Sequence, residues 1–303
     1  MSKKVFRSII LVLTIFVFLV GCGRAPEGQD GGREAKSAYI QIKGSDTSVN
    51  LSQMWAEEYM NNNEGVSISV TGGGSGTGIA AIINNKVDIA NSSRDIKDSE
   101  KQQAEDNGVE IVEIAVAMDG LSVITNANNP VKNLTVEEIG KIFKGEISNW
   151  KEVGGPDLTI NTYGRQSNSG TYVYFRDNVL NGDYTAEMKR MNGNAQLVEA
   201  VKADESGIGY VGIGYVVKDG KTVEGLNILD VNGASPLVAE NVKTGAYPLA
   251  RPLYQYTNGK PTGAVLDLIK YQLSDKGQEL AVREGFYPVT EEYSKRNNKN
   301  LGQ

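Results

Sequence analysis

The chain has 303 residues, of which 40% are hydrophobic and 22% charged, and its formal net charge is −6. This length is enough for two globular lobes with separate cores, and the acidic balance argues against nucleic acid or a polybasic membrane surface as a partner. The chain contains no histidine and one cysteine, Cys22, which excludes Ser-His-Asp and Cys-His catalysis and removes the common zinc ligands. There is no Asp-rich loop with calcium-binding spacing. We therefore expect no metal, no cofactor and no enzymatic activity.

The N-terminus has the layout of a secretory signal peptide, because three basic residues within the first seven precede an apolar run at 9–20. A permanent membrane span needs about 20 apolar residues, so this run is too short for one. The run ends in Leu-Val-Gly-Cys22, which resembles the bacterial lipobox, where the cysteine is lipidated and becomes the mature N-terminus. The alternative is a small-residue cleavage site beside an incidental cysteine.

We predict a signal peptide over 1–21 and, at 22–38, a lipidated (palmitate-type) cysteine with a flexible polar tether, because this segment has few apolar residues. The remaining body has a net charge of −9 once the three basic residues of the signal are removed. We expect this body at the outer face of the cytoplasmic membrane of a bacterium, held by the lipid.

The first half of the folded part repeats one unit: a strand, a turn rich in Ser, Thr and Gly, and a helix. Strands are predicted over 39–42, 66–70, 87–90 and 109–118, and helices over 51–59, 79–83 and 98–107. This alternation predicts a mostly parallel sheet with helices on both faces. In such sheets ligands bind beyond the carboxyl ends of the strands, where these turns collect.

The second half begins after Asp119, where the pattern changes. Further elements are predicted as strands over 121–125, 158–162 and 247–257, and as helices over 135–143, 169–180, 195–203 and 265–273. Residues 208–216 form an apolar segment that glycines interrupt. Thr135 and Glu138 form a capping box at the start of one helix. We assign 39–117 and 247–295 to a first lobe and 118–246 to a second, and we expect 296–303 to fray.

One turn, at 163–171, has the features of an anion site. Ser169, Gly170 and Thr171 lie on the first turn of a helix, where backbone N–H groups lack intrahelical partners and the helix dipole is positive. Arg165 is close enough to fold back over the same point with a forked guanidinium. Taken alone, this turn is slightly better explained as an ordinary capped helix with a surface arginine.

The glycine-rich segment 72–78 does not match a nucleotide-binding motif. A P-loop needs a lysine where Ile79 stands, and no frame gives the dinucleotide pattern of glycines. Glycines between a strand and a helix do allow backbone amides to approach a ligand closely.

Four strand-to-helix turns carry small hydroxyl residues: Asp46-Thr47-Ser48, Ser75, Ser92-Ser93-Arg94 and Ser169-Gly170-Thr171. Hydroxyls and amides donate hydrogen bonds without adding charge, which suits a dehydrated oxyanion held between two lobes. Ser and Thr are also ordinary N-cap residues. The prediction of an oxyanion site therefore depends on the coincidence of all four turns.

Five segments carry a resemblance to a known family: Arg165-x-x-x-Ser169-Gly170-Thr171, Gly74-Ser75-Gly76, Ile208-Gly-Tyr-Val-Gly, Tyr247-Pro-Leu-x-Arg-Pro-Leu-Tyr254 and Leu273-Ser-x-x-Gly-Gln278. Over 40–289 the chain resembles the phosphate-binding protein of the high-affinity phosphate ABC transporter, the PstS family. The resemblance implies an α/β, two-lobe, periplasmic-binding-protein-like (type II) fold with a mostly parallel sheet flanked by helices in each lobe. It also implies two hinge crossings, which we place near Met118 and Tyr247.

By the same resemblance, the expected function is an extracytoplasmic receptor, a monomer, that captures inorganic phosphate between its lobes and delivers it to permease subunits. One alternative is a binder of another tetrahedral oxyanion, such as sulfate, molybdate or tungstate. A phosphate-ester hydrolase is a further alternative, but it would need a metal cluster or an activated nucleophile, and the sequence offers neither.

The resemblance implies that phosphate is bound by Arg165, Ser169, Gly170, Thr171, Ser75 and the pair Asp46 and Thr47. We add Ser93 and Arg94 to the predicted site because they lie on another of the four hydroxyl turns. Better-known members have an aspartate where Ser93 stands, and it accepts the hydrogen of protonated phosphate. We predict that Asp119 supplies this acceptor, because it ends an apolar strand with no helix directly after it and its carboxylate should be free. Asp46 should instead cap the helix that begins at Thr47.

Overall fold

The computed structural model describes residues 37–302. The predicted signal peptide, Cys22 and most of the tether lie outside the described residues. Across 37–302, none of the helices has both the length and the apolar character that a membrane crossing requires.

The first sheet has the strand order β2-β1-β3-β14-β4. Its strands are β1 (Ala38–Gly44), β2 (Val66–Thr71), β3 (Ile89–Ser92), β4 (Ile111–Gly120) and β14 (Ala250–Asn258). β1 pairs with β2 and β3 in parallel, whereas β14 is antiparallel to both β3 and β4. Four of the five strands therefore point in one direction, and only the strand from the end of the chain opposes them.

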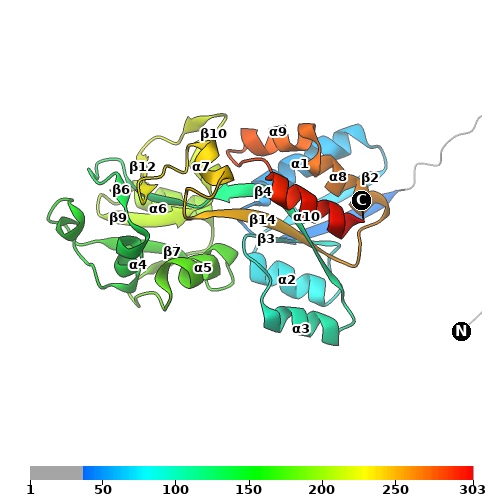
Figure 1. Cartoon of the computed structure of the whole chain (residues 1–303), viewed down its shortest axis with the longest axis horizontal. Helices are drawn as coiled ribbons and strands as arrows, with labels where there is room; N and C mark the ends of the chain where they lie inside the picture. Colours follow the sequence, from blue (N-terminus) through cyan, green and yellow to red (C-terminus); the bar gives the residue numbers. More distant parts are fainter. Residues whose placement is uncertain (1–36, 303) are drawn as a thin grey trace, which may run out of the picture. The chain divides into compact units, whose positions relative to one another are not determined.

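Helices cover both faces of this sheet, as the strand-and-helix repeat predicts (Figure 1). They are α1 (Val49–Asn62), α2 (Ser75–Ile83), α3 (Asp98–Asp106), α8 (Gly263–Leu273), α9 (Asp275–Arg283) and α10 (Glu291–Leu301). On α1, Leu51, Trp55 and Tyr59 recur every four residues, so they share the helix face that is buried. The indole N–H of Trp55 donates to the carbonyl of Gly277 at 2.7 Å, which joins α1 to α9.

The second sheet has the order β12-β5-β9-β7-β8. Its strands are β5 (Ser122–Asn126), β7 (Asn161–Arg165), β8 (Lys189–Met191), β9 (Gly207–Val211) and β12 (Leu226–Ile228). β7 pairs in parallel with β8 and β9, and β5 is antiparallel to β9 and β12. Again one strand, β5, opposes four, which agrees with the expected mostly parallel lobes.

The second sheet carries its own helices and short elements. The helices are α4 (Val136–Lys144), α5 (Gly170–Phe175), α6 (Asn194–Lys202) and α7 (Ala239–Lys243). Two 3₁₀ turns (Trp150–Val153 and Ile213–Tyr215) and one π turn (Arg176–Leu180) accompany them. Two small ladders pair β6 (Asn133–Leu134) to β13 (Asp230–Val231), and β10 (Val217–Lys218) to β11 (Lys221–Thr222). The predicted capping box is confirmed: Glu138 N donates to Thr135 Oγ1, and Thr135 N donates to Glu138 Oε2.

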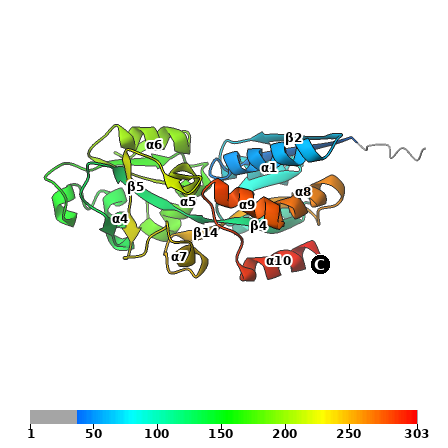
Figure 2. The same ribbon diagram turned by 90° about the horizontal axis from the view of Figure 1, so that it is seen from above.

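Within residues 37–302, the chain passes between the two sheets twice. It leaves the first sheet where β4 gives way to β5, around Leu121, and returns where β14 begins, after Leu249. The two passages lie side by side, since Leu121 N donates to Leu249 O at 3.2 Å and Tyr247 Oη donates to Leu121 O at 2.7 Å. Figure 2 shows β4 and β14 at this junction from above. The two-lobe fold with two crossings is thus confirmed.

The expectation that 296–303 frays is wrong over 296–301, which belong to α10. β4 is an edge strand, so its outer backbone groups need partners from elsewhere. Asn297 supplies them: its amide nitrogen donates to Ala115 O at 2.7 Å, and its amide oxygen accepts from Ala115 N at 3.0 Å. Asn300 donates to Glu113 O in the same way. Apolar periodicity does not reveal a helix that docks through its amides.

Candidate functional site

Four hydroxyl side chains from the predicted turns meet between the lobes, and we call them the hydroxyl cluster: Thr47, Ser75 and Ser93 from the first lobe, and Thr171 from the second. Oγ1 of Thr47 lies 2.8 Å from Oγ1 of Thr171. Oγ of Ser93 lies 3.4 Å from both Oγ of Ser75 and Oγ1 of Thr171. All four residues are buried. The structure therefore brings together side chains that are up to 124 residues apart in the chain.

Glycines allow the lobes to approach this closely. Gly76 N donates to the carbonyl of Asn168 at 3.0 Å, across the lobes. A Cβ on Gly74, which has φ of 89°, would lie 2.6 Å from the same carbonyl oxygen. A Cβ on Gly170 would lie 2.2 Å from Oγ of Ser75. The glycine-rich loop thus serves close backbone approach between lobes.

Arg165 ends β7 and is 1% exposed, so the interpretation as a surface arginine is wrong. Its Nη2 donates to Oδ2 of Asp46 at 2.5 Å and to Asn192 O at 3.0 Å, and its Nη1 donates to Oδ1 of Asn194 at 2.8 Å. Within residues 37–302, Nε of Arg165 and Nδ2 of Asn194 are buried without a hydrogen-bond partner. An unpaired buried donor is costly, so both groups are suited to an acceptor that arrives from outside.

Asp46 does not cap a helix, contrary to expectation. α1 begins at Val49, and its N-cap Ser48 makes no side-chain cap among the described residues. Oδ1 of Asp46 instead accepts from Gly73 N at 2.7 Å, while Oδ2 accepts from Arg165. The carboxylate therefore links the glycine-rich loop of the first lobe to the arginine of the second.

The expectation that the Asp119 carboxylate is free is also wrong. Asp119 is 0% exposed, and its Oδ2 accepts from Nε and Nη2 of Arg251 at 3.0 and 2.8 Å. Its Oδ1 accepts from Ile213 N at 2.9 Å. The physical reason is strand register, because antiparallel pairing of β4 with β14 sets Arg251 directly opposite Asp119.

Arg251 is a residue that the sequence analysis did not assign to the site. Its Nη1 donates to Ser93 O at 2.9 Å, and its Nη2 donates to Oγ1 of Thr171 at 3.0 Å. Its guanidinium also lies 4.9 Å from the ring centroid of Tyr174. The available signal was a charged residue within the otherwise apolar segment 247–254.

Arg94 is not part of the cluster, which corrects its assignment. Its Nη1 and Nη2 donate to the two carboxylate oxygens of Glu100 at 2.8 and 2.6 Å. Burial raises the pKa of Glu100, but the hydrogen bonds from Arg94 and from the backbone of Lys97 outweigh it and hold that pKa below its usual value. Ser169 is buried and caps α5, since its Oγ accepts from Tyr172 N at 3.4 Å.

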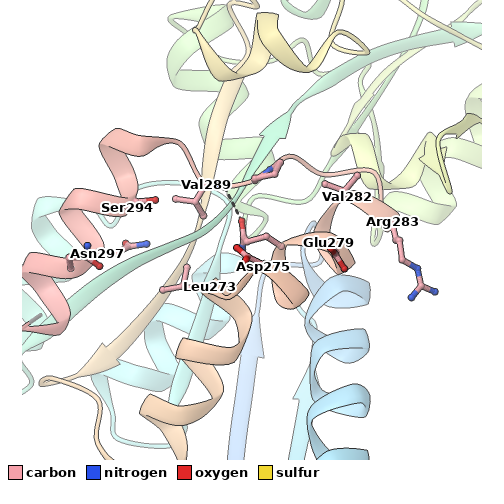
Figure 3. Close-up of a pocket in the computed structure, with 11 residues that line it drawn as sticks. Leu273, Asp275, Glu279, Val282, Arg283, Val289, Ser294 and Asn297 are labelled. Atoms are coloured by element: carbon pink, nitrogen blue, oxygen red, sulfur yellow. Dashed lines mark hydrogen bonds between the residues drawn. The ribbon is translucent and has the colours of Figure 1, made fainter.

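A hollow of about 880 Å³ lies elsewhere, between α9 and α10 (Figure 3). Its lining includes Asp275, Glu279 and Arg283, so acidic groups outnumber basic ones, which disfavours an anion. The lining contains no member of the hydroxyl cluster. No group of acidic side chains within 37–302 is arranged to hold a metal ion.

Comparison with known proteins adds a family model, relatives and solved structures. Residues 31–276 match the model of the PBP superfamily domain. The chain is 33% identical over 289 residues to the phosphate-binding protein PstS of Pseudomonas aeruginosa, covering 88% of each chain. It is 32% identical over 299 residues to the protein of the same name from Bacillus subtilis, covering 96% of each.

Two solved structures are also similar. One is a crystal structure with bound phosphate, from Clostridium perfringens, described as a substrate-binding protein of a phosphate ABC transporter. It has a TM-score of 0.76 and 30% identity, and the match covers 83% of this chain and 100% of that one. The other is an ABC-type phosphate transport receptor from Vibrio cholerae, with a TM-score of 0.69, 27% identity and coverage of 82% and 100%.

Proposed function

Since this chain belongs to the phosphate-binding PstS family of the PBP superfamily, we propose that it captures inorganic phosphate between its lobes outside the cytoplasmic membrane and delivers it to an ABC permease. The names of its relatives support the ligand and the transport role. The main structural support for this proposal is the hydroxyl cluster, which is buried and includes residues from both lobes.

The ligand would be held mostly by neutral donors. Thr47, Ser75, Ser93 and Thr171 each offer a hydroxyl that can donate to an anion oxygen instead of to a neighbouring hydroxyl. Ser75 also starts the nine-residue helix α2, so its hydroxyl lies at the positive end of the helix dipole, although the backbone N–H of Gly76 there already donates to Asn168 O. These donors do not depend on net charge, which matters because the body of the protein is acidic.

Arg165 would supply the charge-assisted hydrogen bonds. It is buried beside the cluster, and its Nε is unpaired within the described residues. A guanidinium offers a fixed fork of donors that matches an oxyanion. Ser169 and Gly170 complete this part of the site, since they begin the same helix turn as Thr171.

Selectivity for phosphate over sulfate is best explained by Asp46. Phosphate keeps a proton near neutral pH and sulfate does not, so a nearby carboxylate accepts from the first and repels the second. The Asp46 side chain is only 18% exposed, adjoins Thr47 and contacts Arg165. Each of its oxygens already accepts one hydrogen bond, and a carboxylate oxygen can accept a second. This assignment replaces the one for Asp119.

Closure of the lobes around the ligand would follow the usual hinge transition, at the two passages near Leu121 and Leu249. Residues 39–117 and 247–295 would move against 118–246. A signal peptide over 1–21 would direct export and be removed. Lipidation of Cys22 would then hold the protein, as a monomer, at the outer face of the membrane, close to its permease. Capture and release need no bond cleavage, so no turnover of phosphate esters is expected.

Isothermal titration calorimetry of the purified body, residues 37–303, tests this function. Phosphate should bind, while sulfate and molybdate at the same concentrations should bind far more weakly. Tight binding of sulfate or molybdate in place of phosphate would assign the site to another tetrahedral oxyanion. Release of phosphate from an ester by the pure protein would contradict a purely binding role.

A further inference from the structure

Arg251 and Asp119 form a buried ion pair at the point where both strands pass between the lobes. Asp119 is the residue before the end of β4, and Arg251 is the second residue of β14. Their exposed fractions are 0% and 2%. Two N–H groups of the guanidinium donate to one carboxylate oxygen, Oδ2, at 3.0 and 2.8 Å. The pair therefore joins the two crossing strands at the hinge.

The same pair reaches both lobes. On the first lobe, Arg251 donates to Ser93 O at 2.9 Å. On the second lobe, it donates to Oγ1 of Thr171 at 3.0 Å, and Asp119 accepts from Ile213 N at 2.9 Å. Four of the five N–H groups of Arg251 are used in these contacts. With Asp119 neutralising its charge, Arg251 has little left to offer an anion directly.

The contact with Thr171 fixes the direction of a hydrogen bond. A guanidinium can only donate, so Oγ1 of Thr171 must accept from Arg251. The single proton of Thr171 is then available for Thr47, for Ser93 or for a ligand oxygen, all of which compete for it. Arg251 thereby turns the Thr171 hydroxyl into a donor toward the centre of the cluster.

The geometry points to Arg251, held by Asp119, as a positioning residue that orients Thr171 to donate to the bound oxyanion and that does not itself touch the ligand. This inference rests on the proposed function, because it concerns the same site. A buried arginine near an anion site can have two roles. It can bind the anion directly, as proposed for Arg165, or it can orient another residue, here Thr171, that binds the anion.

The test compares two variants by calorimetry with inorganic phosphate and by thermal melting. Arg251→Met alone leaves the Asp119 charge buried and unpaired, which should lower the melting temperature strongly. The double variant Arg251→Met/Asp119→Leu removes both charges, so its melting temperature should return toward that of the wild type. Its phosphate affinity should nevertheless stay roughly tenfold or more below wild type, because the support of Thr171 is gone. Wild-type affinity in the double variant would overturn the inference, since the pair would then be merely structural.

A second comparison asks whether Arg251 acts through Thr171. If it does, the triple variant, which carries Thr171→Val together with Arg251→Met and Asp119→Leu, should bind phosphate no more than about twofold more weakly than the single variant Thr171→Val. Full additivity of the losses would show that Arg251 acts on the ligand independently and would overturn the inference. Arg296→Met is the matched control, because Arg296 also pairs with a carboxylate of β4, that of Glu113, away from the cluster. It should bind phosphate as the wild type does.

The wild-type titration separates this inference from the proposed function. If the wild type binds sulfate or molybdate instead of phosphate, the proposed function fails, and the same variants are compared with that anion. A wild type that binds none of the three anions overturns both.

Discussion

Thr47 of the first lobe and Thr171 of the second lobe meet through their hydroxyl oxygens at 2.8 Å. No strand pairing joins the turns that carry these two residues. The contact therefore exists only because the lobes bring the two turns together. A ligand bound at this point would contact both lobes at once. Its measured affinity would then include the free energy of bringing the lobes into this arrangement.

Replacing Arg165 by lysine should weaken phosphate binding by about 1.5–3 kcal/mol, although the charge is kept. The guanidinium holds Asp46, Asn192 and Asn194 with three separate hydrogen bonds, and a point charge cannot reproduce that fork. Calorimetry measures the loss. Arg176→Lys is the control, because Arg176 pairs with an aspartate near the surface, and this variant should bind phosphate as the wild type does. Undiminished affinity in the Arg165 variant would show that Arg165 does not contact the ligand.

Replacing Asp46 by asparagine should narrow the difference between phosphate and sulfate affinity. Sites that pair a polar hydrogen of the ligand can reject analogues without it by about 10⁴–10⁵-fold, and an amide no longer repels sulfate as a carboxylate does. Asp119→Asn should weaken binding of both anions and leave their ratio unchanged, because that carboxylate is held by Arg251 and Ile213. The reverse pattern in competitive titrations would restore Asp119 as the proton acceptor.

Replacing Asn297 by leucine should destabilise the fold without affecting the ligand. The substitution leaves both the N–H and the C=O of Ala115 unpaired, and each buried unpaired group costs about 1–3 kcal/mol. Denaturant unfolding should show the loss, while phosphate affinity at a temperature well below the melting point stays the same. Asn298→Leu is the control, because Asn298 is the exposed neighbour on the same helix. Equal losses in the two variants would mean that the hydrogen bonds between Asn297 and Ala115 contribute nothing to stability.

Replacing Cys22 by serine should leave the protein unprocessed or unanchored, with phosphate binding in the folded body intact. The lipid can be attached only to the cysteine, and the phosphate-binding residues proposed here all lie within the described residues, from Asp46 onward. Cell fractionation and the mass of the mature N-terminus measure the outcome. If the serine variant is still processed at this position and remains with the membrane, the lipoprotein assignment fails.

The elements with a local signal could be predicted from the sequence. α4 shows this, because its capping box and αL glycine at Gly145 are both set by neighbouring residues. Three of the four hydroxyl turns could also be placed together, because they follow β1, β2 and β3, parallel strands of one sheet whose carboxyl ends lie at one edge. The fourth turn, at Ser169, follows β7 of the second sheet and reaches the others only because the two lobes meet.

What could not be predicted depends on long-range pairing. The partners of Asp46 and Asp119 were both predicted wrongly, since a carboxylate's partners come from distant segments: Arg165 is 119 residues from Asp46, and Arg251 is 132 residues from Asp119. Only the β4–β14 register reveals the second pair. Arg94 was misassigned for the same kind of reason, because adjacency to Ser93 does not fix where a long side chain points. Its nearest acceptor, Glu100, lies on the following helix.

The asparagines of α10 have a consequence for how copies of the protein meet. An edge strand with open backbone groups is a template on which another chain can add a strand and start an aggregate. β4 would offer such a template at Glu113 and Ala115 if Asn300 and Asn297 did not occupy those groups. Deletion of α10 should therefore cause aggregation that increases with protein concentration, in addition to any fall in melting temperature. The amides of α10 thus occupy backbone groups of β4 on which a second chain could otherwise add a strand.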